Sequence, residues 1–311
     1  AIDMPHPSTR CAVALAALAW LAPASAAQVP VFTWTGDADS FLLGSAVHGA
    51  GDANRDGVPD AVVGAESGNV ARIFSGSDGS LLHEIVGDPP GDLFGKAVSG
   101  VGDVDGDGHD DVIVGACAGF GRVQVFSGAT GDALHTFSGG PDFDNLGWSV
   151  AGLHDLDGDG VPEIAGGAPV SGFVRIWSGA SGDELFTTVG GVPFTDRFGE
   201  VVRRAGDVDG DGLDDLIVGA PGGEFVRVVS GNGGGILGTL TGAGPNDGFG
   251  RALDGPGDLD GDGHADVVVG APFAGYVRVY SGRDLAPLYT LRGATGFGVC
   301  VAGAGQIGRA S

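Results

Sequence analysis

Short apolar runs alternate with glycine-rich turns along most of this chain, and residues 94–142 show one unit of the pattern. Two runs of strand length, F-G-K-A-V-S-G-V-G (94–102) and D-V-I-V-G-A (111–116), flank an acidic segment. The next run, G-R-V-Q-V-F-S-G (121–128), alternates with a period of two, as a half-buried strand does. A turn and a fourth run, 133–139, complete the unit. Four short strands in about 50 residues, without helical periodicity, predict one four-stranded blade of a β-propeller.

The unit recurs along the chain, which predicts an all-β repeat protein. Its acidic loops begin at residues 52, 103, 155, 207 and 258, so successive starts are 51 or 52 residues apart. A Phe-Gly or Leu-Gly pair stands before each loop and once more near the C-terminus, at Leu43-Gly44, Phe94-Gly95, Leu146-Gly147, Phe198-Gly199, Phe249-Gly250 and Phe297-Gly298. The second run ends in Gly-Ala, with proline next in the last three copies. Proline suits the end of a strand, where no ladder donor is needed.

The acidic loops have the composition of a calcium site. Oxygen ligands at loop positions 1, 3, 5 and 9, a backbone carbonyl at position 7 and glycine at position 6 suit a hard cation. An EF-hand would need glutamate at position 12 and a following helix, and the twelfth positions here lie within expected strands. The expected ligands are Asp52, Asn54, Asp56, Val58 and Asp60; Asp103, Asp105, Asp107, His109 and Asp111; Asp155, Asp157, Asp159, Val161 and Glu163; Asp207, Asp209, Asp211, Leu213 and Asp215; and Asp258, Asp260, Asp262, His264 and Asp266.

We therefore expect about five Ca²⁺ sites, of which the first is the weakest. There Asn54 replaces an aspartate and Arg55 replaces a glycine, which lowers the negative charge. The five loops hold 21 of the 40 acidic residues, so most of the net charge of −25 is metal-site charge. With a single lysine in such an acidic chain, nucleic acid is excluded as a partner.

The order Phe-Gly, D-x-D-G-D-G-x-x-D, Gly-Ala-Pro resembles the FG-GAP repeats of the integrin α-subunit propeller and of many exported bacterial proteins. The resemblance covers nearly all of residues 31–311 and implies a β-propeller with seven blades and bound calcium. We count five complete blades plus parts of a closing blade. V-F-T-W-T-G (31–36) matches a fourth strand and F-G-V-C-V-A-G-A-G (297–305) a first strand. Gln306 then stands where the next calcium aspartate belongs, which suggests truncation at the C-terminus.

The N-terminus has the pattern of an export signal. Arg10 precedes an apolar run of twelve residues (11–22), followed by P-A-S-A-A with cleavage expected after Ala26 or Ala27. We assign residues 1–26 to a signal peptide, with 1–3 as an upstream extension, and 27–311 to the propeller. The protein is thus expected to be secreted, periplasmic or on the cell surface, with no membrane span. Cys117 and Cys300 are expected to be free thiols.

No catalytic motif is found, so we expect a non-enzyme. The arginines of the third strands recur and are read as scaffold, linked to a neighbouring acidic loop. Non-repeating residues in the loops opposite the calcium loops are better candidates for binding: Phe120, Asp142, Phe143, Asp144, Phe194, Arg197 and Phe273. The leading hypothesis is an adhesion or protein-interaction module with an extracellular protein or glycan as partner. The alternatives are a lectin-like propeller and the propeller domain of a larger secreted hydrolase or lyase.

Overall fold

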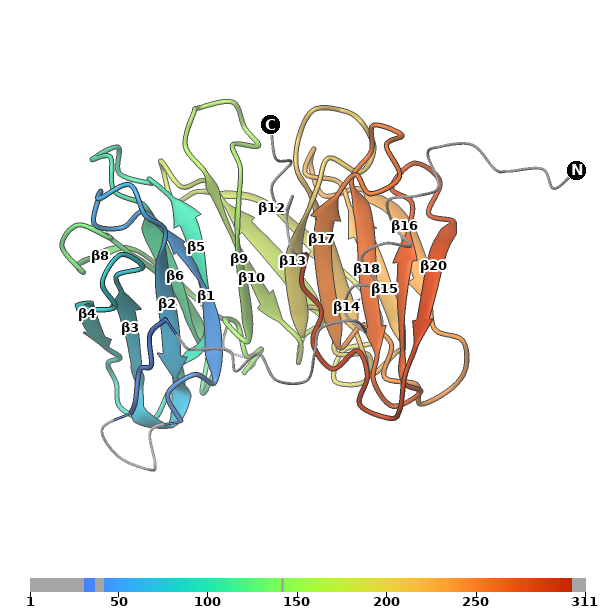
Figure 1. Ribbon diagram of the computed structural model, residues 1–311, viewed down its shortest axis with the longest axis horizontal. Helices are drawn as coiled ribbons and strands as arrows, with labels where there is room; N and C mark the ends of the chain where they lie inside the picture. The colour runs from blue at the N-terminus through green and yellow to red at the C-terminus, as the bar shows by residue number, and fades with distance from the viewer. Residues whose placement is uncertain (1–30, 37–41, 141–142, 304–311) are drawn as a thin grey trace, which may run out of the picture. The chain divides into compact units, whose positions relative to one another are not determined.

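The computed structural model describes residues 31–36, 42–140 and 143–303. The chain divides into two compact units, Ala1–Trp34 and Thr35–Ser311. Every strand of the described residues lies in the second unit (Figure 1). The expected signal peptide, residues 1–26, lies outside the described residues.

Within the described residues, twenty strands form five four-stranded sheets, here called blades 1 to 5 in chain order. The described chain also has a 3₁₀ turn, η2 (Glu66–Gly68), between β2 and β3. The strands are β1 (Ala46–Gly51), β2 (Asp60–Ala65), β3 (Val70–Phe74) and β4 (Leu81–Val86); β5 (Phe94–Gly102), β6 (Asp111–Ala116), β7 (Arg122–Phe126) and β8 (Ala133–Ser138); β9 (Ser149–Leu153), β10 (Glu163–Ala168), β11 (Phe173–Trp177) and β12 (Glu184–Val189); β13 (Val201–Gly206), β14 (Asp215–Ala220), β15 (Phe225–Val229) and β16 (Ile236–Thr241); and β17 (Ala252–Gly257), β18 (Asp266–Ala271), β19 (Tyr276–Tyr280) and β20 (Pro287–Arg292).

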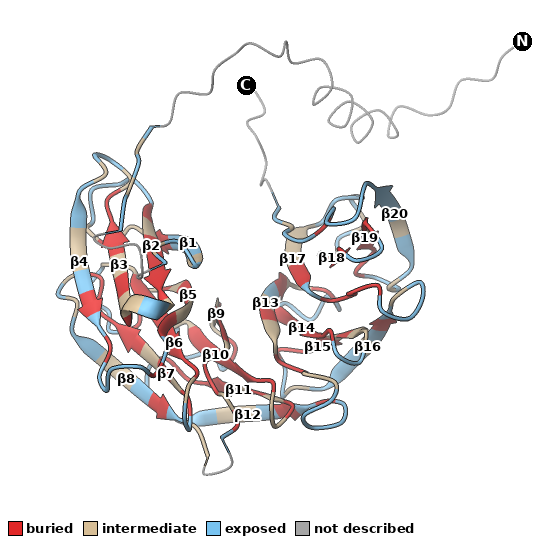
Figure 2. Cartoon of the chain, turned by 90° about the horizontal axis from the view of Figure 1, so that it is seen from below, coloured by how far each residue is buried: buried red, intermediate tan, exposed pale blue. Residues whose placement is uncertain are grey.

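Each blade is an antiparallel meander in which strands neighbouring in sequence are neighbours in the sheet. The first strands, β1, β5, β9, β13 and β17, lie on the inner side of the second unit, and the last strands lie outside (Figure 2). The four runs of residues 94–139 become β5 to β8 within two residues at either end. The prediction of an all-β fold of four-stranded propeller blades is therefore confirmed.

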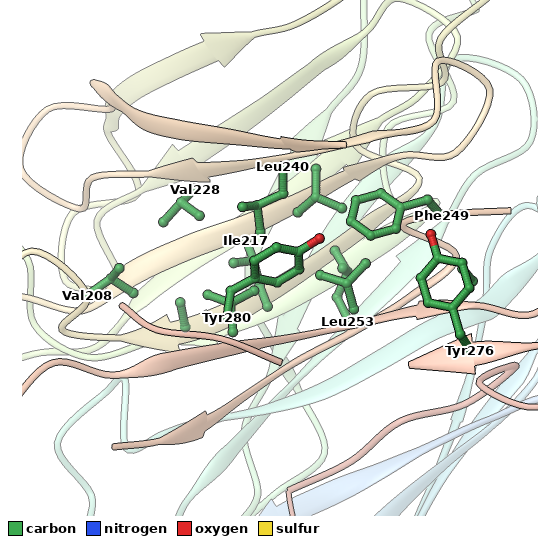
Figure 3. Close-up of a cluster of buried hydrophobic side chains, with 13 residues drawn as sticks. Val208, Ile217, Val228, Leu240, Phe249, Leu253, Tyr276 and Tyr280 are labelled. Atoms are coloured by element: carbon green, nitrogen blue, oxygen red, sulfur yellow. The ribbon is translucent and has the colours of Figure 1, made fainter. Parts of the chain in front are cut away.

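The hydrophobic core lies between successive blades, because the buried strands are apolar on both faces. Between blades 4 and 5, for example, Val208, Ile217, Val228 and Leu240 meet Phe249, Leu253, Tyr276 and Tyr280 (Figure 3). Similar clusters join blades 1 and 2, 2 and 3, and 3 and 4. Burial of each such side chain contributes roughly 1.5–3 kcal/mol, so stacking of blades provides most of the apolar stabilisation.

The glycine near the end of each second strand packs against the glycine of the next Phe-Gly or Leu-Gly pair. A Cβ on Gly219, at the end of β14, would lie 2.4 Å from the carbonyl oxygen of Gly250, which follows Phe249 in the next blade. The same approach recurs at Gly64, Gly115, Gly167 and Gly270, each against the glycine that opens the following blade. The Phe or Leu before that glycine is fully buried in blades 2 to 5. The motif thus fixes the spacing between blades.

The outer face of blade 5 differs from the same face of blade 4. Leu259 and Leu291 are 50% and 51% exposed, whereas Val208 and Leu240, at the corresponding positions, are 1% and 5% exposed. No strand is assigned to residues 31–36 or 297–303, so the described chain does not form the expected closing blade. A single segment without a second strand has no partner for a ladder. Gln306 lies outside the described residues.

Candidate metal centres

The acidic loops join the first and second strands of every blade, and their own carboxylates curl them. In the second loop, Asp103 Oδ1 accepts the backbone N–H groups of Gly106 and Asp107, at 2.7 and 3.1 Å. Its Oδ2 accepts the N–H of Gly108 at 2.8 Å. Gly108 has φ +86°, a conformation that glycine adopts without steric cost. The aspartate at position 1 and the glycine at position 6 therefore act together to form the tight turn of the loop.

This curl brings carboxylates together in four of the five loops. Within each group, one ligand atom per residue lies within 4.8 Å of the others; the groups are Asp103, Asp105 and Asp107; Asp155, Asp157, Asp159 and Glu163; Asp207, Asp209 and Asp215; and Asp258, Asp260 and Asp262. Converging carboxylate oxygens are the ligands that Ca²⁺ takes in proteins. Most of the expected ligands at positions 1, 3 and 5 are thus gathered at one centre.

The carboxylate at position 9 has a second role that the sequence did not reveal. Asp111 is fully buried; its Oδ2 accepts the N–H of Val104 at 2.7 Å and its Oδ1 that of Gly128 at 2.9 Å. Gly128 lies in the turn between β7 and β8, so Asp111 fastens the acidic loop to this turn of the same blade. Asp215 and Asp266 make the same pair of hydrogen bonds, and Asp60 makes a similar pair with the N–H groups of Asn54 and Gly76.

Burial without a cation disfavours the charged form of these groups. Burial, followed by repulsion from Asp105 and Asp103, raises the pKa of Asp111 to about 6. The pKa of Glu163 rises to about 8, mainly through burial and then through repulsion from Asp157 and Asp155. Glu163 Oε1 is buried and has no hydrogen-bond partner among the described residues. A divalent cation at this group would supply the missing partner and lower the repulsion, so the residues present fit such an ion.

Position 7 is expected to contribute its backbone carbonyl, and two of the side chains at this position are engaged elsewhere. His109 Nδ1 lies 2.8 Å from the carbonyl oxygen of Ala53, and His264 Nδ1 lies 2.8 Å from that of Val208. Both carbonyls belong to the loop of the preceding blade. These histidines therefore connect neighbouring loops.

The first loop departs from the others in structure as well as in sequence. Asn54 Nδ2 donates to Asp56 Oδ2 at 3.1 Å, so an amide N–H replaces part of what a cation would supply. Arg55 reaches the second loop, where its Nη1 donates to the Asp107 carbonyl oxygen at 3.4 Å. This loop is not among the acidic groups found in the described chain. Both features support the expectation that its site is the weakest.

Two expectations about other residues need correction. Asp144 is a repeated structural residue: it is buried and accepts the N–H groups of Gly140 and Leu146, much as Asp247 accepts those of Ala243 and Phe249. The arginines of the third strands were expected to link to a neighbouring acidic loop, and the contacts found among the described residues lie elsewhere. They are Arg72 with Glu84 and Arg175 with Glu184 on the fourth strands, Arg227 with the Val189 carbonyl oxygen of the preceding blade, and Arg278 with Tyr280 on its own strand.

The remaining loop candidates fall into two classes. Phe120 and Phe143 are 55% and 60% exposed, and their rings stack at 5.2 Å; Phe194 and Phe273 are exposed as well. Arg197, by contrast, pairs with Glu200 at 2.8 Å and lies over the ring of Trp148. Trp148, which Lys96 also approaches, was not among the residues expected from the sequence. Asp142 lies outside the described residues.

Two further observations concern the cysteines and the possibility of a membrane-spanning helix. Cys117 is buried and Cys300 exposed, and both are free thiols, as expected. Burial raises the pKa of Cys117 to about 11. In the described part of the chain, no helix has the length and hydrophobicity that crossing a membrane requires.

The FG-GAP repeat family matches residues 94–126, 146–183, 204–237 and 249–283. Similar proteins include integrin alpha-5 of Xenopus laevis, 31% identical over 222 residues that cover 62% of this chain and 21% of the relative. Integrin alpha-V of Gallus gallus is 30% identical over 221 residues, covering 62% and 20%. Integrin alpha-PS2 of Drosophila melanogaster is 31% identical over 220 residues, covering 60% and 16%. The chain thus spans about a fifth of the length of these relatives.

Proposed function

Since this chain is an FG-GAP repeat protein, we propose that it acts as an exported, calcium-binding adhesion or protein-interaction module without enzymatic activity. The observation that carries the calcium part is the convergence of carboxylates within 4.8 Å in four loops at equivalent positions. The similarity to integrin α chains supports the interaction role.

In this proposal calcium is structural. Asp155, Asp157, Asp159 and Glu163 would hold the ion of the third loop, and the corresponding residues would hold the others. The ion would neutralise carboxylates that otherwise repel one another, and would keep each loop closed over its own blade.

Metal content tests this part directly. At dialysis equilibrium with buffer that contains free calcium, elemental analysis corrected for the free ion should find about four ions per chain, or five if the first loop binds. Replacement of Asp209 and Asp211 by Asn should remove one ion. A calcium content below one ion per chain in the presence of free calcium would reject the proposal.

Export is the second part of the proposal, and it is supported by the N-terminal apolar run alone. Expression in a bacterial host with an intact secretion pathway should yield a mature protein that begins at Ala27 or Gln28. Mass spectrometry of the secreted or periplasmic fraction measures this. An unprocessed protein that stays in the cytoplasm would contradict it.

The partner surface is proposed to lie at the loops opposite the calcium loops, where Phe120, Phe143, Phe194 and Phe273 are exposed. Because Phe120 and Phe143 stack on each other, one face of each ring is covered, which suits contact with a protein better than stacking on a sugar. Binding to immobilised extracellular proteins should weaken when both residues become serine, whereas Leu81→Ser, also at an exposed site, serves as control. Binding to a glycan array that depends on these two phenylalanines would favour the lectin-like alternative.

A further inference from the structure

The inner strands of the five blades differ at one register position, although the blades share one pattern. The residues that pair with the third residue of each second strand are His48, Ser99, Ala151, Arg203 and Asp254. At the next position four blades have glycine and blade 4 has Arg204. Residues needed for the fold recur from blade to blade, so these departures indicate a feature that the fold does not require.

The differing residues surround a cavity. A space of about 410 Å³ is lined by first-strand residues of all five blades, among them His48, Arg203, Arg204 and Asp254. A second cavity, of about 300 Å³, shares His48, Val150 and Arg203 with the first. Arg203 is thus accessible from both, and the volumes are those of small-molecule sites.

The two arginines differ in how their charge is balanced. Arg204 Nη1 lies 3.4 Å from Asp214 Oδ2, and it also contacts His154, whose Nδ1 lies 2.9 Å from the same oxygen. These three groups form a closed set. Arg204 therefore needs no further anion.

Arg203 is not balanced in this way. Its Nη1 donates to the Val202 carbonyl oxygen at 2.9 Å, and no carboxylate of the described chain lies within ion-pair distance. Burial lowers the pKa of Arg203, and Asp254, in the neighbouring blade, partly opposes this. A guanidinium has five N–H donors, so most of those of Arg203 remain available to a ligand. In a chain of net charge −25 this is an unusual place for an unpaired cation.

We propose that the central cavity binds a small monoanionic carboxylate, with Arg203 as the residue that pairs with its carboxyl group. The planar fork of a guanidinium matches a carboxylate through two parallel hydrogen bonds. Asp254, at the equivalent position of blade 5, disfavours the second negative charge of a phosphate. His48 adds an exposed imidazole from blade 1. Arg203 and Asp254 both lie on first strands, outside the acidic loops.

The test uses acetate, butyrate and benzoate as probes, with inorganic phosphate for comparison. Binding to the full chain is followed by the Nε–Hε resonances of arginine in ¹H–¹⁵N spectra. At least one carboxylate should shift the Arg203 resonance saturably. Arg203→Ala should weaken that binding about 10- to 100-fold, as loss of a charge-assisted hydrogen bond does, measured by calorimetry.

The chain itself provides the controls. Alanine already stands at this register position in blade 3, as Ala151, so Arg203→Ala should fold; Arg203→Gln gives a second variant of similar size. Arg175→Ala, which removes an arginine paired with Glu184 on another strand, should bind like the wild type. Absence of binding by all three carboxylates would overturn the proposal. The proposal would also be overturned if both Arg203 variants bound the carboxylate as tightly as the wild type does, or if phosphate bound more tightly than the carboxylates.

Discussion

Removal of the proposed calcium ions should lower the free energy of unfolding of this protein. The size of the effect depends on the repulsion within its four groups of carboxylates. Two unit charges at 4.8 Å repel by about 1 kcal/mol in a water-like medium and by more in a protein interior. A group of three carboxylates contains three such pairs, so an ion that neutralises them acts against roughly 3 kcal/mol of repulsion. Extracellular sites typically have Kd values of about 10⁻⁴ M, and at about 1 mM calcium each then contributes about 1.4 kcal/mol.

Four such sites would together contribute about 6 kcal/mol, which is comparable with the whole stability of an ordinary domain. Since 1 kcal/mol shifts the melting temperature of a domain of this size by roughly 2 °C, chelation should lower Tm by about 10 °C or more. Differential scanning calorimetry with calcium and with excess EGTA, at neutral pH and constant ionic strength, measures this. Asp260→Asn with Asp262→Asn should reduce the difference by about a quarter.

The control is Asp284→Asn, which removes a carboxylate from the turn between β19 and β20, where Asp284 accepts one N–H of Ala286. It should leave the calcium dependence of Tm unchanged. If EGTA strips the metal, as elemental analysis would show, and Tm stays within about 2 °C, then the ions do not stabilise the blades. The structural role proposed here would then be wrong.

Three other predictions follow from particular residues. In EGTA, the free energy of unfolding should fall as pH rises from about 4 to 8, because the folded state holds the protons of three carboxyl groups more tightly than the unfolded state does. The pKa is raised to about 6 for Asp111 and Asp215 and to about 8 for Glu163. Urea unfolding at several pH values measures this, and a rise in stability over that range would contradict it. Saturating calcium should remove much of this decline, since the ion replaces the protons. Gly219→Ala should destabilise by roughly 1–3 kcal/mol because its Cβ would lie 2.4 Å from the Gly250 carbonyl oxygen, while Gly49→Ala, with open space around its Cβ, should change stability by less than about 0.5 kcal/mol. Asn54→Asp with Arg55→Gly should raise the number of bound calcium ions by one, as measured by native mass spectrometry; an unchanged count would mean that another feature of the first loop prevents binding.

Much of the fold could be predicted from the sequence because its determinants are local and repeated. The runs at 94–102, 111–116, 121–128 and 133–139 became β5 to β8, since period-two patterns and glycine-bounded apolar runs specify strands by themselves. The partial closing blade was not formed by residues 31–36 or 297–303, because a strand depends on a partner that local sequence does not supply.

The sites were predictable to a smaller extent. Positions 1, 3 and 5 converge in three of the acidic loops because each loop folds on itself through Asx hydrogen bonds. The hydrogen bond that Asp111 accepts from Gly128, 17 residues away, was not visible in the spacing. In the sequence Asp144 had no evident counterpart in other loops. The hydrogen bonds show that Asp247 accepts the equivalent backbone N–H group in its own loop.

The sequence by itself determined the blade, its acidic loop and the number of copies, because each copy has the same pattern of strands, turns and spaced carboxylates. The tertiary structure decided what neighbouring blades do to one another. It placed His109 against the loop of blade 1, brought Gly219 against Gly250, and set Arg203 on the inner strands with no carboxylate of the described residues paired to it. Such contacts depend on how blades pack around a common centre, and packing joins residues that no local pattern connects.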